Sequence, residues 1–495
     1  MNTLSTLTFS ALCAALLAAV PSASTYPLEA DPRPNVVILL TDDQTLRSMR
    51  AMPRTRALIG DAGATFTNAF VNNPRCCPSR ATFLTGQYSH NHGVLTNGPP
   101  GGGWPRLRGT SNWLPTWLRQ AGYRTVQVGK FMNLYGRDDP YEVPAGWDEW
   151  YATVDPTTYR YYGYTVNENG TLRTYGRDRD PQWYSTDFIA RRSADIVERL
   201  APSPQPFFLS VGFLAPHTGG PREPGDPAGI ATPAIAPRHR GAFAAARLPQ
   251  PTSFDEADVS DKPAFLRRPR LRPRTVAQIG ALYRQRLESL KAVDDAVERI
   301  VDGLRDAGEL ERTLIVFTSD NGYLAGEHRL GHGKAQVYEP AIRVPLMIRG
   351  PGVPRASRPS QLVTNADLAP TILDVADATA GRPQDGRPLL PLARDPGPGR
   401  DRPLLIEVAT GTAMRTTAIR TDRWLYAEHA GGATELYDLF TDPQELNSLH
   451  AVPGLAGLRA TLAHRLQELR RCRSVECRRP LALARGSGSG TVPSP

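Results

Sequence analysis

The sequence predicts an α/β fold: a mixed, mostly parallel central sheet flanked by helices, followed by a smaller α+β subdomain with an antiparallel sheet. Short apolar runs rich in β-branched residues alternate with long amphipathic segments, as expected when helices cover both faces of a parallel sheet. After about residue 381 the pattern changes to short strand-like pieces between turns, which is typical of an antiparallel sheet. A chain of 495 residues is long enough for two or three domains.

Several apolar runs are predicted to be buried strands, and polar residues suited to chemistry come directly after them. The runs are residues 34–41, 123–129, 206–211 and 313–318. The polar residues beyond their ends are Asp42, Asp43, Lys130, His217, Asp320 and Asn321. Because functional groups in open α/β sheets gather beyond the carboxyl ends of the strands, we expect these side chains to meet at one edge of the sheet.

A long helix is predicted from a cap at Thr275 to about Ala307, because apolar residues recur there every three or four positions. Before it, residues 219–274 are rich in Pro, Gly and Arg and lack periodicity, so we expect a lid or a substrate-facing insertion. A further strand is expected at 345–349 and a further helix at 365–377.

The chain is expected to divide into a catalytic domain at residues 32–385 and a C-terminal subdomain at 400–480, joined by a linker rich in Pro, Gly and Arg. The elements expected in the subdomain are strands at 404–408, 414–420 and 424–427 and a helix at 455–470. Residues 486–495 are rich in Gly, Ser and Pro, a composition typical of a disordered tail.

Residues 1–24 have the composition of a secretory signal peptide, with an apolar run from Phe9 to Val20 followed by small residues. The segment lacks the Lys or Arg that usually begins such a signal. No later stretch approaches the roughly 18 uninterrupted apolar residues that a membrane span needs. We therefore expect a secreted protein, extracellular or periplasm-like in location, without stable membrane insertion.

The five cysteines agree with an oxidising compartment. Cys13 lies within the predicted signal, and Cys76 and Cys77 are adjacent. Cys472 and Cys477 close a small loop, which suits a disulfide in that environment. The alternative, two free or metal-binding cysteines, lacks the further Cys or His spacing of a zinc site.

The net charge of +9 indicates an acidic partner, and the densest basic run extends from Arg267 to Arg274. Such a run is usually a solvated segment. Nucleic acid fits poorly, because the sequence has no recognisable module for reading it and the protein is expected to be exported. A sulfated or otherwise anionic glycan fits better.

The stretch Arg75-Cys76-Cys77-Pro78-Ser79-Arg80 places a turn former, a hydroxyl and a fixed cation beside two cysteines that cannot easily pair with each other. The plain alternative is a pair of buried small hydrophobes before a helix. With Leu84-Thr85-Gly86 downstream, Cys76-x-Pro78-Ser79-Arg80 resembles the signature of the type I sulfatases. The resemblance implies an alkaline-phosphatase-like sandwich. It also implies that a formylglycine-generating enzyme converts Cys76 to Cα-formylglycine, the catalytic nucleophile.

Hard oxygen ligands follow two of the predicted strands, and they suit Ca²⁺ or Mg²⁺ rather than zinc. Taken singly, the adjacent Asp42 and Asp43 could cap a helix, and Asp320 with Asn321 could form a turn. The sulfatase resemblance implies that these four residues and the modified Cys76 bind one metal ion, Ca²⁺ with Mg²⁺ as the alternative.

Fixed cations near the predicted site would stabilise the negative oxygens of a sulfate ester in the transition state. The candidates are Arg80, Lys130, His217 and Lys334; a single Lys is otherwise most often a solvated surface charge. The resemblance implies that Arg80 and Lys130 bind the formylglycine, while His217 and Lys334 contact the sulfate and one of them helps the leaving oxygen depart.

The sequence departs from the commoner sulfatase pattern after Lys130. Many members place a His two residues later, where this chain has Met132, which cannot shuttle a proton. The role of that His passes either to Asn133 or to no residue in this chain. The sequence Gly-Lys-Phe-Met-Asn resembles the branch of N-acetylglucosamine-6-sulfatase and the extracellular endosulfatases. His90-Asn91-His92 resembles the same branch, and these histidines either line the pocket rim or are ordinary loop residues.

The function predicted is a secreted sulfatase that hydrolyses sulfate esters, of a sulfated sugar or an aryl sulfate, through a formylglycine hydrate and one divalent cation. One alternative is a phosphate or phosphonate monoester hydrolase of the same superfamily, although most of these use Ser or Thr and bind two metals. The other is a non-catalytic protein that binds anionic glycans, which would explain the basic charge without any nucleophile.

Overall fold

A nine-stranded sheet forms the centre of the structure, a computed structural model that describes residues 31–397 and 402–481. In spatial order its strands are β2 (Ala64–Thr65), β12 (Leu346–Arg349), β9 (Thr313–Ser319), β1 (Asn35–Thr41), β8 (Phe207–Gly212), β4 (Arg124–Gly129), β5 (Glu149–Thr153), β6 (Tyr164–Glu168) and β7 (Thr171–Tyr175). The five strands from β9 to β5 run parallel, and the outer pairings on both sides are antiparallel. The predicted mixed, mostly parallel sheet is confirmed. The signal expected at 1–24 and the tail expected at 486–495 lie outside the described residues.

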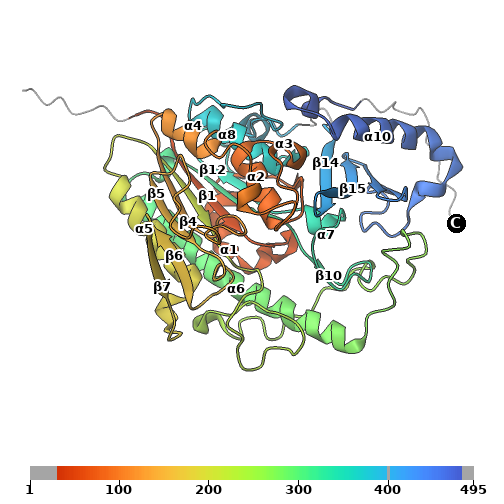
Figure 1. Ribbon diagram of the computed structural model, residues 1–495, viewed down its shortest axis with the longest axis horizontal. Coiled ribbons are helices and arrows are strands. Elements are labelled where there is room, and N and C mark those ends of the chain that lie inside the picture. Colours follow the sequence, from red (N-terminus) through yellow and green to blue (C-terminus); the bar gives the residue numbers. More distant parts are fainter. Residues whose placement is uncertain (1–30, 398–401, 482–495) are drawn as a thin grey trace, which may run out of the picture.

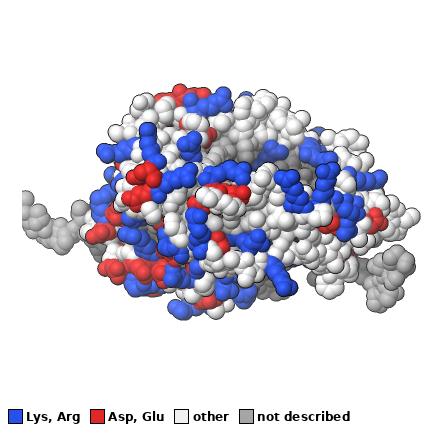
Figure 2. All heavy atoms as spheres, turned by 90° about the horizontal axis from the view of Figure 1, so that it is seen from below, with Lys and Arg blue, Asp and Glu red and all other residues white. Residues whose placement is uncertain are grey.

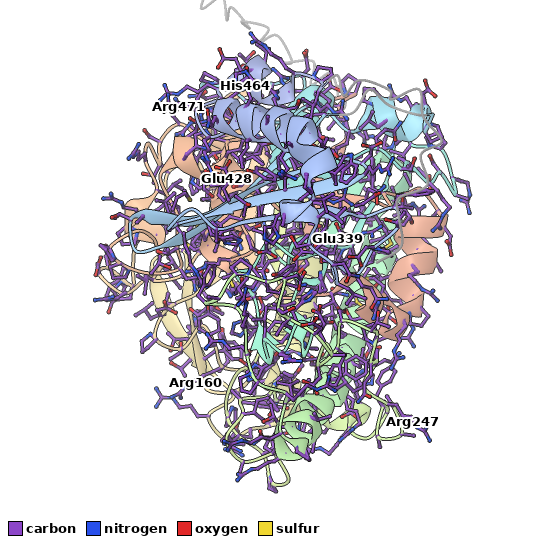
Figure 3. The ribbon with its side chains drawn as sticks, turned by 90° about the vertical axis from the view of Figure 1, so that its right-hand side faces the viewer. Arg160, Arg247, Glu339, Glu428, His464 and Arg471 are labelled. Carbon is purple, nitrogen blue, oxygen red and sulfur yellow. A yellow bond between two sulfur atoms is a disulfide. The ribbon has the colours of Figure 1, made fainter. Side chains whose placement is uncertain are left out.

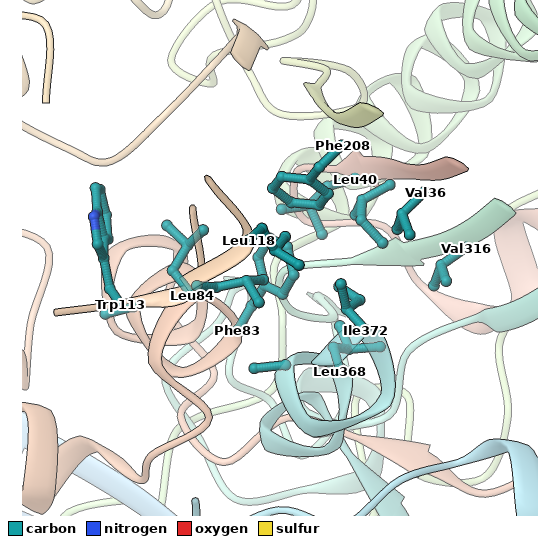
Figure 4. Close-up of a cluster of buried hydrophobic side chains, with 14 of the residues drawn as sticks. Val36, Leu40, Phe83, Leu84, Trp113, Leu118, Phe208, Val316, Leu368 and Ile372 are labelled. Atoms are coloured by element: carbon teal, nitrogen blue, oxygen red, sulfur yellow. The ribbon is translucent and has the colours of Figure 1, made fainter. Parts of the chain in front are cut away.

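The central strands are buried on both faces, as their apolar composition predicts. Every residue of β1 is buried, and alternate side chains enter two separate cores: Val36 and Leu40 face one, Val37 and Leu39 the other. Helices α4 (Leu114–Gln120), α2 (Cys76–Thr85) and α8 (Leu368–Val375) cover the first face. Figure 4 shows side chains of α2, α8 and the strands meeting in that core. The opposite face is covered by α5 (Ser185–Leu200) and α6 (Pro273–Asp306) (Figure 1).

Helix α6 begins at Pro273, two residues before the predicted cap, and Arg272 occupies the N-cap position. Proline suits the first helical position because its missing N–H needs no partner there and its φ is already helical. The prediction that Thr275 caps the helix is therefore wrong. The other end is close to the predicted one, and Gly308 follows it with a φ of 74°.

Residues 219–272 of the predicted insertion form turns, bends, isolated β-bridges and one 3-10 turn, Pro237–His239, while its last two residues belong to α6. Charged side chains tie the insertion to the rest of the protein. Arg238 pairs with Asp187 of α5 at 2.6 Å and with Asp295 of α6 at 3.0 Å. The buried Lys262 pairs with Glu256 at 3.2 Å and donates to the Leu446 carbonyl at 2.9 Å. The insertion thus contacts both the catalytic part and the C-terminal part, and its role as a lid stays a prediction.

A four-stranded antiparallel sheet forms the C-terminal part, as predicted. Its elements are β14 (Leu404–Thr410), β15 (Ala413–Arg420), β16 (Trp424–His429), β17 (Thr434–Asp438) and helix α10 (Ala456–Leu469). In Figure 3 helix α10 lies above this sheet, and Arg470 at its end pairs with the labelled Glu428 at 2.6 Å. Cys472 and Cys477 form the predicted disulfide. We keep 32–385 and 400–480 as the proposed limits of the two parts.

The remaining α-helices and strands are short. They are α1 (Pro53–Thr55), β3 (Ala69–Phe70), α3 (Ser89–His92), β10 (Leu324–Ala325), β11 (His332–Gly333), α7 (Glu339–Ile342), β13 (Val363–Thr364) and α9 (Leu390–Arg394). The helix predicted at 365–377 is a 3-10 turn, Asn365–Asp367, that continues into α8.

Buried charges join the two parts of the structure. Arg402 donates to both carboxylate oxygens of Asp367, at 2.9 and 2.6 Å, and both side chains are buried. Arg420 of β15 donates to Glu339 of α7 at 2.7 Å. Removing one member of such a pair leaves an uncompensated buried charge, which costs about 3–5 kcal/mol.

His90 of α3 makes a third junction, and its two ring nitrogens both face acceptors. Nδ1 lies 2.9 Å from Glu407 Oε1 and Nε2 lies 3.0 Å from the Cys472 carbonyl. Two acceptors require two N–H donors, so the geometry favours the charged imidazolium. Burial opposes that charge, but Glu407 outweighs it and raises the pKa of His90 from 6.5 to about 9.

We expect the stability of the protein to fall as the pH rises from 6.5 to about 9. Because the pKa of His90 is higher in the folded state than in the unfolded state, the charged imidazolium stabilises the fold fully below pH 6.5. That contribution, up to about 3 kcal/mol, is lost as the pH rises past the folded-state pKa of about 9. His90→Gln should remove this part of the pH dependence, measured as Tm against pH. His464→Gln, on the exposed surface of α10 (Figure 3), is the control and should leave the dependence as it was. The same slope in both variants would contradict the interpretation.

Candidate active site

The carboxyl ends of β1 and β9 and the first residue of α2 bring the predicted metal ligands together. Cys76 Sγ and one carboxylate oxygen each of Asp42, Asp43 and Asp320 all lie within 4.8 Å of one another, and all four residues are buried. His217, which follows β8, makes a similar group with Asp42 and Cys76. Asp42 and Asp320, which lie far apart in the sequence, thus meet at the predicted edge of the sheet.

Cys76 lies at the centre of this group. Its Sγ donates to Asp42 Oδ1 at 3.2 Å and accepts a hydrogen bond from Lys334 Nζ at 2.7 Å. Burial and the negative charge of Asp42 raise the pKa of the Cys76 thiol well above its usual range. The unmodified side chain therefore keeps its proton at neutral pH, which makes it a weak nucleophile.

The oxygen atoms around Cys76 fit a hard divalent cation. Asn321 Nδ2 donates to Asp43 Oδ1 at 2.6 Å and to the Gly322 carbonyl at 2.8 Å. Asn321 Oδ1 is buried and has no hydrogen-bond partner within the described residues, so it is free to bind a metal. Burial and repulsion by Asp42 raise the pKa of Asp320 to about 6. A cation among these groups would relieve that repulsion, and carboxylate and amide oxygens are the ligands of Ca²⁺ and Mg²⁺.

Two lysines donate to the aspartates. Lys130 Nζ donates to Asp42, and Lys334 Nζ donates to Asp43 as well as to Cys76. Lys130 is buried, whereas the Lys334 side chain is 16% exposed and reaches the site from the solvent side. Of these two cations, only Lys334 contacts the sulfur.

Arg80 positions the other groups rather than contacting Cys76 Sγ. Its Nε donates to Asp320 Oδ2 at 2.8 Å, and its Nη1 donates to the carbonyls of Lys130 at 2.9 Å and Phe131 at 3.2 Å. Arg80 lies one turn after Cys76 in α2, so it links this helix to the ends of β9 and β4. Negative charge from Asp320 and Asp42 overcomes burial and raises the pKa of Arg80, so the guanidinium stays charged.

A model of the sulfatase family matches residues 34–378, and a model described as N-sulphoglucosamine sulphohydrolase, C-terminal, matches residues 326–472. The chain belongs to the sulfatase family. This places it among the sulfuric ester hydrolases and confirms the resemblance carried by the Cys76 motif.

Two curated relatives support the membership. An arylsulfatase from Volvox carteri is 34% identical over 97% of this chain and 80% of its own length. An N-acetylglucosamine-6-sulfatase from Homo sapiens is 39% identical over 73% of this chain and 64% of its own length, so this chain spans just under two thirds of that relative. The human relative bears out the resemblance to the N-acetylglucosamine-6-sulfatase branch.

Solved structures confirm the alkaline-phosphatase-like fold. A protein solved with its substrate D-glucosamine-2-N,6-O-disulfate superposes with a TM-score of 0.72 and 24% identity, covering 88% of this chain and 97% of that one. At this identity the likeness concerns the fold alone. Within residues 31–397 and 402–481, none of the helices combines the length and the apolar character needed to cross a membrane.

Tyr159 is a residue of this sulfatase site that the sequence did not reveal. Its hydroxyl accepts hydrogen bonds from Lys130 Nζ at 3.1 Å and from Asn133 Nδ2, and its ring centre lies 4.7 Å from that of His217. Met132, at the position where many sulfatases have His, is 1% exposed and packs in the apolar core. The polar contacts beside Lys130 are made here by Tyr159 and Asn133. Tyr159 lies in a loop without periodicity, so no signal marked it.

Arg286 was also missed. It lies on the buried face of α6 and donates to the backbone carbonyls of Asp43 and of Pro216, the latter at 3.1 Å. These contacts fix the loops that carry Asp43 and His217. A buried Arg within an apolar helix face is the signal that could have identified it.

The two histidines of the sequence His90-Asn91-His92 lie outside the site. His90 joins the C-terminal part, as described above. His92 is buried, its Nε2 lies 3.0 Å from Thr82 Oγ1, and its Nδ1 accepts from the Val94 amide at 3.1 Å. Burial lowers the pKa of His92 to about 3, so it stays neutral and structural. Neither lines the pocket rim.

Proposed function

We propose that this chain is a secreted sulfatase that hydrolyses sulfate esters of sulfated sugars through a formylglycine hydrate at position 76 and one divalent cation, Ca²⁺ or Mg²⁺. The observation that carries the proposal is the position of Cys76, which begins the Cys-x-Pro-Ser-Arg motif and lies among three carboxylates and Lys334. Residues 1–24 would direct export, and a formylglycine-generating enzyme would act on Cys76 during maturation. Nucleic acid and stable membrane insertion have no place in this proposal.

A sulfated sugar is favoured as substrate over a simple aryl sulfate. The human relative is named for N-acetylglucosamine 6-sulfate, and a protein of the same fold was solved with a disulfated glucosamine. The name of the Volvox carteri relative keeps an aryl sulfate as the second candidate. The excess of positive charge in this chain, +9, also suits a polyanionic sugar better than a small aryl ester.

The proposed reaction has two steps. One hydroxyl of the residue-76 hydrate loses its proton to a neighbouring base as it attacks the sulfur. The bond from sulfur to the sugar oxygen breaks, and the sugar alcohol leaves with a proton from a neighbouring acid. The second hydroxyl then loses its proton, the carbon–oxygen bond to the sulfate breaks, and sulfate leaves as the aldehyde re-forms. Water restores the hydrate. When bound, a divalent cation would supply charge neutralisation and make the attacking hydroxyl more acidic.

His217 and Lys334 are the proposed sulfate contacts, and one of them helps the leaving oxygen depart. His217 Nδ1 faces the Thr218 carbonyl at 2.6 Å, so it must carry a proton, and Nε2 points to Asp43 at 3.6 Å. Lys334 approaches Cys76 from the solvent side. Because these contacts should strengthen as charge moves to the leaving oxygen, they act on turnover more than on binding.

Tyr159 is a proposed positioning residue for Lys130 and His217. Tyr159→Phe removes one hydroxyl that accepts from Lys130, and we expect kcat to fall about 3-fold to 10-fold with little change in KM. Tyr159→Leu also removes the ring beside His217 and should cost more. If Tyr159→Phe lost stability but kept the parent kcat, the hydroxyl would be only structural.

The experiment that tests the proposed function compares ester classes on one preparation. We expect sulfate release from N-acetylglucosamine 6-sulfate and from an aryl sulfate to exceed hydrolysis of the matching phosphate and phosphonate esters. Preference for the phosphorus esters would favour the phosphatase alternative. Binding of anionic glycans without hydrolysis of any ester would favour a non-catalytic protein.

A further inference from the structure

A cleft of about 620 Å³ adjoins the active site and is formed by three segments that lie far apart in the sequence. The end of the insertion and the start of α6, residues 266–275, form one side. The hairpin of β10 and β11 forms the second side, and Arg415 of β15 lies on the third. Lys334 lines the cleft and also donates to Cys76 Sγ at 2.7 Å, so the cleft opens directly beside the reacting position.

The charge lining this cleft has one sign. Its cations are Arg268, Arg270, Arg272, Arg329, Arg415 and Lys334, and no Asp or Glu of the described residues lines it. Figure 2 shows many Lys and Arg side chains on the face seen from below, with Asp and Glu among them. A cleft lined by one sign of charge concentrates the field and raises the local concentration of ions of the opposite sign.

Several of these guanidinium groups are held in fixed positions by contacts that do not neutralise their positive charge. Arg329 donates to the backbone carbonyls of Glu256 at 2.6 Å, Ala257 at 2.6 Å and Arg268 at 3.0 Å, contacts that orient it without neutralising it. Arg415 stacks over the ring of Phe265 at 5.1 Å. Arg270 pairs with Asp255 at 3.0 Å, but for Arg268, Arg272 and Arg415 no carboxylate of the described chain lies within 4.0 Å.

Arg75 extends the positive charge to the nucleophile itself. It comes directly before Cys76, and its Nε is buried without a hydrogen-bond partner among the described residues. No carboxylate of the described chain lies within 4.0 Å of Arg75, and a buried cation without an acidic partner costs free energy that a bound anion would recover.

We propose that this cleft binds a second anionic group of the substrate, a sulfate or a carboxylate on the same or the next sugar, with Arg415 as its principal contact. The inference rests on the proposed function, which supplies the sulfate that reacts beside Lys334. Recognition of a second charge would make this enzyme selective for sugars that carry at least two anions. A purely solvated arginine run does not explain the fixed orientation of Arg329 and Arg415.

Three sugars that share one reacting ester test the inference. N-acetylglucosamine 6-sulfate carries a single anion, N-sulfoglucosamine 6-sulfate carries a second sulfate, and a uronate-linked N-acetylglucosamine 6-sulfate carries a carboxylate as its second anion. Arg415→Gln should raise KM for the two-anion sugars at least about 10-fold more than for the one-anion sugar, since a charge-assisted contact is lost. The carboxylate and the second sulfate are separate arms, and the larger effect identifies the group that Arg415 prefers.

Arg247→Gln is the matched control, because Arg247 is exposed, carries the same charge and does not line the cleft (Figure 3). It should leave the ratio of KM values at the parent value. If Arg415→Gln changed KM equally for all three sugars, or if Arg247→Gln matched its effect, the second-anion site would be refuted.

Equilibrium binding separates this inference from the proposed function. Calorimetry with N-sulfoglucosamine 6-sulfate compares Cys76→Ala with the Cys76→Ala and Arg415→Gln double variant. At least 10-fold weaker binding by the double variant supports the anion site in the cleft, whether or not the parent protein hydrolyses an ester. Absence of hydrolysis by the parent protein would contradict only the proposed function. Equal binding by the two proteins refutes the cleft while leaving sulfatase activity intact.

Discussion

A Cys76→Ser variant is expected to release at most one equivalent of alcohol per protein molecule and then stop. Serine offers one hydroxyl where the proposed hydrate offers two, so a sulfate ester formed on it has no second hydroxyl through which to collapse. We expect kcat to fall by a factor on the order of 10³ or more, as when a nucleophile is removed. The measurements are the burst of alcohol and the mass of the peptide that contains residue 76, which should carry a sulfate.

Cys77→Ser is the matched control, since it makes the same chemical change one residue away. Cys77 is buried in the apolar core on the α2 side of the sheet, and burial raises the pKa of its thiol to about 12. A hydroxyl in that core should cost about 1–3 kcal/mol of stability while conversion of Cys76 and turnover persist. Parent turnover by Cys76→Ser, or a dead Cys77→Ser variant, would contradict the choice of nucleophile.

Asp320→Ala is expected to lose both the bound cation and nearly all activity. Asp320 contributes one of the three carboxylates beside Cys76 and accepts from Arg80 Nε at 2.8 Å. Loss of the metal together with the Arg80 contact should reduce kcat by a factor on the order of 10² or more. The buried Arg80 also loses its partner, which costs about 3–5 kcal/mol, a cost that the large core should tolerate.

Asp320→Asn separates the two effects of that change. The amide keeps an oxygen for Arg80 and nearly the same volume, so the fold should be more stable than in Asp320→Ala while cation binding and activity remain low. Metal content, Tm and turnover are measured on the same samples. Full activity of the parent protein after thorough chelation would remove the metal from the mechanism.

The parts of the site that the sequence predicts are those that follow buried strands. The run before Asp42 and Asp43 and the run before Asp320 have the composition expected of a central parallel strand, and parallel strands end at the same edge. Proximity of the four candidate metal ligands therefore follows from local patterns. The motif at Cys76 adds the nucleophile through family resemblance.

The residues that escaped prediction act through contacts between distant segments. Tyr159 reaches Lys130 from a loop without periodicity, and Arg415 reaches the cleft from the C-terminal sheet. The edge strands β6 and β7 are short and largely polar on one face, a pattern too weak to separate them from a loop. Thr275 failed as a cap because Pro273, already suited to the first helical turn, begins the helix earlier.

The mass of the peptide that contains residue 76 tests the central claim most directly. The protein is produced in a host that has a formylglycine-generating enzyme. The fraction of the peptide that carries formylglycine at residue 76 is then compared with the turnover number of the same sample. The proposed mechanism predicts formylglycine at position 76, cysteine at position 77, and turnover proportional to the converted fraction. A fully active protein with unmodified Cys76 would contradict it.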